Sequence, residues 1–200
     1  MKIKLTHVLL FLSLIVFLPD NHAHSTTIEK SNDTSLDYSG VSLLGVGLSI
    51  GYYSYGFFGT RSVSVPPLNV YYELGIHEYI TAGPFGGYAR WDYRYSNSDY
   101  AWTFYQIGAR GSFHLTSILN EVFGNTIDED KIDWYIAIMS GLEIRSFSSN
   151  AHPDLYSNRN RIFFGPTAGV RYYLGSNFAL YLEGGRGSLG ALTFGISTRF

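Results

Sequence analysis

The sequence contains no cysteine among its 200 residues, and only 15% of those residues are charged. Without cysteine the chain has no disulfide framework, no thiolate metal site and no cysteine that could carry a lipid. The formal net charge is −2 and there is no basic patch, so the composition argues against nucleic acid as a partner. Because soluble domains usually contain about 25% charged residues, the low charge favours a surface that meets something other than water.

Long apolar runs are also scarce, and the only one lies near the N-terminus. Two lysines precede a largely apolar stretch over residues 8–18, and Ala23 and Ser25 provide small residues for a cleavage site. This arrangement predicts a signal peptide over residues 1–25. The stretch is shorter than the ~20 residues of a membrane-spanning helix, which makes a retained N-terminal anchor the weaker alternative. No later stretch approaches a spanning helix, so an exported membrane protein of this sequence can cross the bilayer only as a closed β-barrel.

Residues 26–39 are polar and show no apolar periodicity, which predicts a flexible tail on the periplasmic side of a membrane. The remaining residues 40–200 have the length of one domain. Aromatic residues and glycine are abundant, with 17 Tyr, 14 Phe and 22 Gly in the whole chain. The sequence therefore predicts one folded domain preceded by a short polar segment.

Residues 191–200 show the organisation of this domain most clearly. Leu192, Phe194 and Ile196 fall on one parity, whereas the intervening positions are small or polar. Since side chains of a strand alternate between its two faces, this stretch predicts a β-strand with one apolar and one polar face. A soluble sheet places the apolar face on a core, while a lipid-embedded barrel turns it outward. One strand is compatible with both arrangements, so the pattern of the other strands is needed to distinguish a soluble sheet from a lipid-embedded barrel.

Seven further segments alternate in a similar way, which gives eight predicted strands of about 9–13 residues, where a tilted spanning strand needs about 9–11. The connections alternate between short and long, as in outer-membrane barrels with short periplasmic turns and longer external loops. The sequence therefore predicts an all-β fold, an eight-stranded antiparallel up-and-down transmembrane β-barrel whose two ends lie on the periplasmic side. The predicted strands cover residues 41–52, 68–77, 80–93, 102–115, 134–145, 162–174, 178–185 and 191–200.

Two segments depart from this regular alternation. Residues 116–133 fall on the side of the short turns yet are long, and the helical spacing of their apolar residues predicts a small helix at the barrel rim. Pro84 and the pair Gly86-Gly87 blur the alternation in residues 80–93, which predicts a β-bulge in that strand.

The charged residues of the predicted strands fall on the polar parity. An arginine on the lipid face costs about 2–4 kcal/mol at the bilayer midplane, so these side chains are expected to point into the lumen. Because unpaired charges inside a narrow barrel are costly as well, we expect a hydrogen-bonded Glu/Arg network that plugs the lumen as a structural element. A polar path for protons, ions or a small solute is the alternative. The predicted network comprises Glu73, Arg110, Glu143, Arg145, Arg171, Glu183 and Arg199.

Two histidines, His77 and His114, are predicted to point inward near the periplasmic end. A metal site needs several ligands at suitable spacing, and neither a histidine pair nor a carboxylate cluster supplies them. The sequence therefore predicts no metal and no cofactor, and both histidines are assigned to the rim or the network. Aromatic residues gather towards the predicted strand ends, as expected where strands cross the membrane interfaces, whereas a soluble sandwich would spread them along its strands.

The apolar and polar faces, the signal segment, the repeated G-x-G strands, residues 71–88 and the terminal Thr198-Arg199-Phe200 resemble the small outer-membrane β-barrel family, the OmpA/OmpX-like proteins of diderm bacteria. The resemblance covers residues 41–200. It implies a location in the outer membrane and contact with outer-membrane lipids. It further implies that Phe200 forms part of the signal read by the barrel-assembly machinery. No active-site motif of the family is present to be transferred.

The function that the sequence favours is that of a structural or surface-interaction barrel. Any extracellular ligand would contact the external loops, which are predicted at residues 53–65, 94–99 and 146–161, because binding residues tend to lie on loops held by a rigid scaffold. A narrow pore for small solutes is one alternative. A soluble barrel of the lipocalin type is another, but it needs a largely apolar lumen, whereas the predicted lumen holds seven charges.

An enzyme that modifies outer-membrane lipids is a further alternative. Such a site needs a nucleophile, a base and an orienting group at one depth of the barrel. The only residues of these types that lie together are Ser148, Ser149, His152 and Asp154, in a predicted loop with no framework to hold them. The chain is therefore predicted not to be an enzyme.

Overall fold

The computed structural model describes residues 37–50, 62–95, 98–124, 127–149 and 159–200. The predicted signal peptide over residues 1–25 and most of the predicted tail lie outside the described residues, as do parts of the three predicted external loops.

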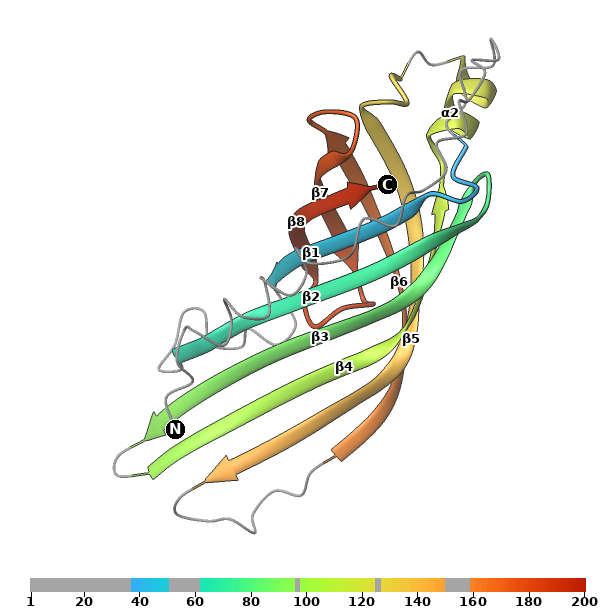
Figure 1. Cartoon of the computed structure of the whole chain (residues 1–200). Coiled ribbons are helices and arrows are strands. Elements are labelled where there is room, and N and C mark those ends of the chain that lie inside the picture. Colours follow the sequence, from blue (N-terminus) through green and yellow to red (C-terminus); the bar gives the residue numbers. More distant parts are fainter. Residues whose placement is uncertain (1–36, 51–61, 96–97, 125–126, 150–158) are drawn as a thin grey trace. The chain divides into compact units, whose positions relative to one another are not determined.

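Eight strands pair antiparallel in sequence order and close into a barrel, because the first strand also pairs with the last. Its ladder with the last strand runs from Leu43 opposite Arg199 to Ile50 opposite Leu192. The predicted all-β, eight-stranded antiparallel barrel is confirmed. The strands are β1 (Ser42–Ile50), β2 (Ser62–His77), β3 (Ile80–Tyr95), β4 (Ser98–His114), β5 (Ile132–Ser149), β6 (Arg159–Tyr173), β7 (Phe178–Gly185) and β8 (Leu192–Arg199) (Figure 1).

The two faces of the barrel wall differ sharply in polarity. Ile107 and Ile138 point outward and are 65% and 49% exposed, while Glu73 and Arg171 on the opposite parity are 0% exposed. Alternation along the strands therefore places apolar side chains outside and charged side chains inside, as the sequence predicts. The outward face of every strand adds to one apolar belt.

The wall is uneven in height, with five tall strands beside three short ones. β2 to β6 contain 15–18 residues each, whereas β1, β7 and β8 contain 8 or 9. The predicted range of about 9–13 residues was wrong for the tall strands, and residues 146–149, assigned to a loop, extend β5. Backbone hydrogen bonds continue the ladders beyond the apolar belt, where polar side chains no longer signal a strand.

The predicted β-bulge in residues 80–93 was wrong, because β3 pairs with β4 in an unbroken register from Ile80 to Tyr95. The irregularities lie in the neighbouring strand, where the ladder of β2 with β3 shifts at Val63–Val65, at Val65–Leu68 and at Gly75–His77. The second of these shifts spans two consecutive prolines, which have no N–H to donate to a ladder.

One end of the barrel, here called the helix end, carries the short helix α2 (Thr116–Phe123) between β4 and β5, where a small rim helix was predicted. Gly124 ends the helix in the left-handed conformation at φ 62°. The Thr116 hydroxyl oxygen accepts a hydrogen bond from the Trp134 amide at 2.8 Å and so ties α2 to β5. Among the described residues, no helix is long and apolar enough to cross a membrane.

A turn before β1 packs against the lumen at the helix end. Tyr38 is 3% exposed, and its ring stacks on that of His114 with centroids 3.6 Å apart. Its amide donates to the Glu78 carbonyl at 3.1 Å. Gly75 permits this approach, because a Cβ there would lie 1.6 Å from the Tyr38 carbonyl oxygen. Residues 37–39 thus close part of the barrel end, although the sequence placed them in a flexible tail.

Candidate functional site

Inward-facing glycines make the lumen wide enough for large side chains. A Cβ on Gly45 of β1 would lie 2.2 Å from the ring of Tyr71, and one on Gly47 would lie 2.2 Å from the Tyr181 hydroxyl. The glycines of β1 therefore leave room for a tyrosine of β2 and a tyrosine of β7, so the lumen is filled by side chains.

Six titratable side chains form an ion cluster at the helix end, all of them at most 3% exposed. Glu73 is the centre of one half. One of its oxygens accepts hydrogen bonds from Arg110 Nε at 2.5 Å and from the Ser112 hydroxyl at 2.7 Å, and the other accepts from the Thr81 hydroxyl at 2.6 Å. We call this set the helix-end cluster: Glu73, Arg110, His114, Asp133, Arg171 and Glu183.

The other carboxylates of the helix-end cluster link the two arginines to the surrounding strands. Arg110 Nη2 lies 2.6 Å from Glu183 Oε2. Arg171 Nη1 donates to Asp133 Oδ2 at 2.7 Å. Each guanidinium also lies over an aromatic ring, with Arg110 4.4 Å from the Tyr71 centroid and Arg171 4.0 Å from that of Tyr135.

His114 lies between two polar side chains at the helix end. Its Nδ1 lies 2.9 Å from Asp133 Oδ1, an acceptor, so Nδ1 carries a proton. Its Nε2 lies 3.1 Å from the Thr81 hydroxyl, whose oxygen also lies 2.6 Å from Glu73. Two guanidinium groups and the His114 ring thus face three carboxylates within the helix-end cluster.

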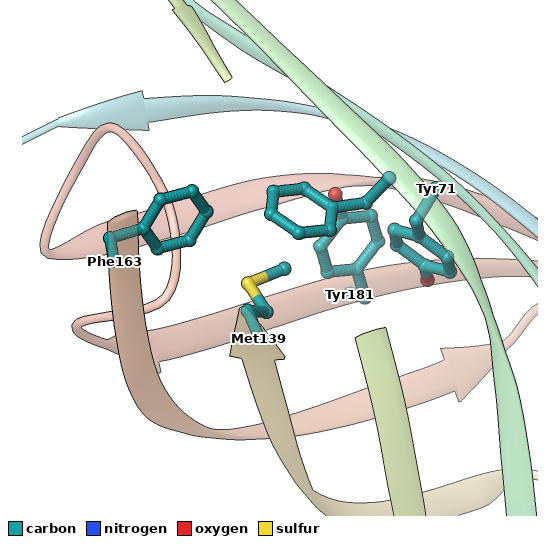
Figure 2. Packing of buried hydrophobic residues seen from close by; sticks show 5 residues of the cluster. Tyr71, Met139, Phe163 and Tyr181 are labelled. Atoms are coloured by element: carbon teal, nitrogen blue, oxygen red, sulfur yellow. The ribbon is translucent and has the colours of Figure 1, made fainter. Parts of the chain in front are cut away.

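An apolar layer separates the helix-end cluster from the opposite end of the lumen. It consists of Tyr71, Phe85, Met139, Phe163 and Tyr181, which are at most 8% exposed (Figure 2). Along β5, Met139 comes between Asp133 and Glu143. The layer therefore divides the buried charges into two groups.

The second group lies at the opposite end, here called the mouth, and is built around Glu143. This side chain is 0% exposed. It accepts from Arg145 Nε at 2.6 Å and from Gln106 Nε2 at 3.1 Å, and Arg161 Nε lies 3.0 Å from it. The two arginine side chains are 30% and 53% exposed, so they connect a buried carboxylate to the outside. We call Gln106, Glu143, Arg145 and Arg161 the mouth cluster.

The connection between β7 and β8 folds inward at the mouth. Leu189 is 0% exposed and packs with Ala89 and Phe104, with Trp91 and Trp102 partly buried against them. Ser188 is buried too, and its hydroxyl lies 3.2 Å from that of Thr193. Residues 186–189, expected only to connect two strands, therefore help to fill the lumen.

A cavity of about 540 Å³ lies between this turn and the mouth cluster. Three arginines line it, contributed by β5, by β6 and by the inward turn: Arg145, Arg161 and Arg186. Gln106 and Ser188 add neutral polar groups, and Ile162, Phe163 and Phe164 add apolar surface. The cavity is thus a basic hollow with one apolar side.

The structure brings six of the seven predicted network residues into these two clusters: Glu73, Arg110, Arg171 and Glu183 at the helix end, and Glu143 and Arg145 at the mouth. The seventh, Arg199, lies at the barrel end instead. Its Nε donates to the Ser176 carbonyl at 2.6 Å, and its guanidinium lies over the Tyr173 ring at 4.0 Å.

Sequence reasoning missed two network members. Asp133 was placed at the end of the helical segment beside an acidic turn, although it is the inward neighbour of the outward Trp134. Arg161 was placed in a loop, because the apolar alternation of β6 begins only after it. Both histidines were predicted to belong to the rim or to the network. His114 belongs to the network, whereas His77 is exposed and contacts Tyr79.

The sequence also raised the questions of a metal site and of a catalytic group. No three His, Asp or Glu side chains among the described residues are arranged to hold a metal ion. Ser148 and Ser149 lie at the end of β5, while His152 and Asp154, which were considered with them as a catalytic group, lie outside the described residues.

The closed barrel, the apolar outer belt and the charged lumen define a class of fold, that of the eight-stranded antiparallel β-barrels. No family model matches the sequence, and no curated protein is similar to it in sequence.

Solved structures similar to this chain include outer-membrane proteins. Ail, the attachment invasion locus protein of Yersinia pestis, in complex with the heparin analogue sucrose octasulfate, is 14% identical over 81% of this chain and 99% of its own, with a TM-score of 0.47. OprG from Pseudomonas aeruginosa is 8% identical over 82% and 97%, with a TM-score of 0.48. Neisserial surface protein A is 13% identical over 80% and 94%, with a TM-score of 0.39. At these identities the similarity is one of fold alone.

Proposed function

We propose that the chain is an integral protein of the outer membrane of a diderm bacterium, with a structural or surface-interaction role. The observation that carries the proposal is the apolar belt around the barrel. Leu48, Val70, Phe194 and Ile196 are each more than a third exposed, and similar side chains lie on the outward face of every strand. A water-soluble monomer rarely exposes so large a continuous apolar surface, whereas a lipid bilayer solvates it.

The buried charges favour a plugged lumen over a pore. The helix-end cluster fills the cross-section of the barrel with paired groups, and the layer around Met139 and Phe163 lies between it and the mouth. A conducting path would need water beside these groups, and a soluble lipocalin-type carrier would need an apolar interior. We therefore infer that the network holds the strands together and transports nothing.

The proposed partners follow from this placement. Outer-membrane lipids surround the belt, and the barrel-assembly machinery recognises the chain during its insertion, with Phe200, which is 59% exposed, as part of the proposed signal. Any extracellular ligand binds at the mouth and its loops, because the helix end then faces the periplasm. No catalytic role is assigned, and the proposal includes neither a cofactor nor nucleic acid.

Heat modification of the folded chain tests the membrane assignment. The chain is refolded into detergent micelles and run on a gel with and without boiling, beside circular dichroism spectra. A β-rich spectrum and a mobility that changes on boiling support a membrane barrel. A monodisperse, folded protein in buffer without detergent would contradict the assignment.

Conductance across a planar bilayer tests the plugged lumen separately. The proposal predicts no single-channel steps from the refolded protein. The conductance of the Glu73→Gln variant is compared with that of the unmodified chain, because this substitution removes one charged member of the helix-end cluster. Regular steps from the unmodified chain would replace the structural role with that of a pore.

A further inference from the structure

We propose that the cavity at the mouth is a binding site for a phosphate ester. This inference deepens the surface-interaction role proposed above and rests on it, since it names the chemistry that the mouth recognises. Four observations carry it: the charge of the cavity, the position of Arg186, a buried amide oxygen that accepts no hydrogen bond from the described residues, and the open side of β6.

The described residues at the cavity carry an excess of positive charge. Within this set, Arg145, Arg161 and Arg186 supply three guanidinium groups, and Glu143, which pairs with the first two, supplies one carboxylate, an excess of two positive charges. A phosphate monoester carries about −1.5 to −2 at neutral pH. Arginine is also the side chain whose planar fork suits phosphate oxygens.

Arg186 differs from the other two cavity arginines, which both pair with Glu143. It is exposed, and its side chain forms no ion pair within the described part of the chain. Its backbone, by contrast, is fixed. The Arg186 amide donates to the Pro166 carbonyl at 2.9 Å, and a Cβ on Gly165 would lie 2.4 Å from the Arg186 carbonyl oxygen. A charged side chain is thus held at the cavity on a close-packed turn.

Gln106 supplies a buried acceptor at the cavity lining. The residue is 5% exposed, and its amide nitrogen donates to Glu143, which fixes the orientation of the amide group. Its carbonyl oxygen accepts no hydrogen bond from the described residues. Since a buried unsatisfied acceptor is costly, a hydroxyl donor on the bound molecule would relieve it.

The cavity is open on its β6 side. β6 pairs with β7 only over Thr167–Tyr173, whereas its ladder with β5 continues to Arg159. Ile162 and Phe164, on the outward face of this unpaired length, are 84% and 70% exposed, well above the 36–49% of most belt residues. A phosphate ester could therefore enter as the headgroup of a membrane lipid, with its chains over these two residues, or as a free sugar phosphate from solution.

Binding measurements on the full chain folded in neutral detergent test the site, with two probes that separate the sources. The free probe is glucose 1-phosphate, followed by calorimetry. The lipid probe is phosphatidic acid in phosphatidylcholine nanodiscs, compared with phosphatidylcholine alone, followed by native mass spectrometry. Binding of the first probe assigns a soluble ester, and binding of the second alone assigns a lipid headgroup.

Arg186→Gln is the variant that decides, because the residue makes no contact with the buried carboxylate Glu143. Loss of one charge-assisted hydrogen bond predicts binding about tenfold weaker for the probe that binds. Arg186→Lys keeps the positive charge but loses the planar guanidinium group. Its affinity for the probe is expected to lie between that of the unmodified chain and that of Arg186→Gln. Lys131→Gln removes one positive charge at the helix end and is expected to bind as the unmodified chain does.

Three results would overturn the proposal: neither probe binds, Arg186→Gln binds as tightly as the unmodified chain, or Lys131→Gln weakens binding equally. Each variant is first checked for the heat-dependent gel shift. If the unmodified chain shows the shift but binds neither probe, the phosphate site is refuted and the membrane barrel stands. If the unmodified chain lacks the shift, the membrane barrel itself is refuted.

Discussion

The helix-end cluster and the mouth cluster use the same chemistry in different surroundings. Glu73 and Glu143 are both 0% exposed and both accept hydrogen bonds from arginine. The partners of Glu73 are buried with it, with side-chain exposures of 1% for Arg110 and 0% for Arg171, whereas those of Glu143 are 30% and 53% exposed. The cost of breaking a buried ion pair is mainly that of the charge left behind. The two clusters should therefore respond differently to the same substitution.

The largest effect is expected for Glu73→Gln. The substitution keeps the shape of the side chain and removes its charge, which leaves Arg110 and Arg171 with less negative charge in a buried site. We expect a loss of about 3–5 kcal/mol in the free energy of unfolding. Urea titration of the protein in lipid vesicles, followed by tryptophan fluorescence, measures it. A loss below about 1 kcal/mol would mean that the helix-end cluster is hydrated and not buried.

The next effect is steric and is expected for Gly45→Ala. The new Cβ would lie 2.2 Å from the Tyr71 ring, which must move together with the arginine stacked on it. Overpacking of this kind costs about 1–3 kcal/mol. Gly111→Ala is the matched control, because the nearest atom to its Cβ is 3.9 Å away. Equal stability of the two variants would contradict the packing of tyrosine against glycine.

A smaller effect is expected for Glu143→Gln at the mouth. Arg145 and Arg161 lose their carboxylate partner, but both are already partly exposed and can turn to water. The loss should be about 1 kcal/mol, that of an ordinary hydrogen bond. The same urea titration measures it, and the informative quantity is the difference from Glu73→Gln. If the two variants lose the same free energy, exposure of the partners does not govern the cost.

The smallest effect is expected at the surface turn before β5. Lys131 Nζ lies 2.8 Å from Asp128 Oδ2, and this hydrogen bond lowers the pKa of Asp128 and raises that of Lys131. Lys131→Gln should return the pKa of Asp128 towards its ordinary value, which NMR titration of the carboxyl carbon detects. Because the folded pKa of Asp128 is depressed, its small stabilising effect is present above the unfolded pKa and is lost as the pH falls. A midpoint in urea that moves as far as for Glu143→Gln would contradict this ranking.

The alternation of side chains predicted which face each residue occupies, and this was enough for the barrel and for most of the network. Glu73, Arg110 and Arg171 were placed inside because each lies on the polar parity of its strand. The parity of a residue does not, however, predict how deep its side chain lies in the barrel or which residue it pairs with. It did not predict that Glu73 pairs with Arg110 while Glu143 pairs with Arg161, since those contacts depend on the register between strands.

The features that the sequence did not predict lie where the apolar alternation stops. The parts of β5 and β6 at the mouth are mostly polar, so the side chains there do not show the apolar alternation that would have predicted the backbone pairing. The inward turn with Leu189 was missed because a single buried leucine in a short glycine-rich connection has no periodicity. Asp133 was missed for a related reason, since it is the first inward residue of its strand and follows an acidic turn.

The orientation of the wall underlies the account of both clusters, and NMR of the chain in lipid nanodiscs tests it without any substitution. Cross-peaks between lipid acyl-chain protons and side-chain methyl groups report which residues touch the bilayer. We predict such cross-peaks for Ile107 and Ile138, which face outward, and none for Ala137 and Met139, which face the lumen. Lipid contacts at Ala137 and Met139, with none at Ile107 and Ile138, would contradict the account.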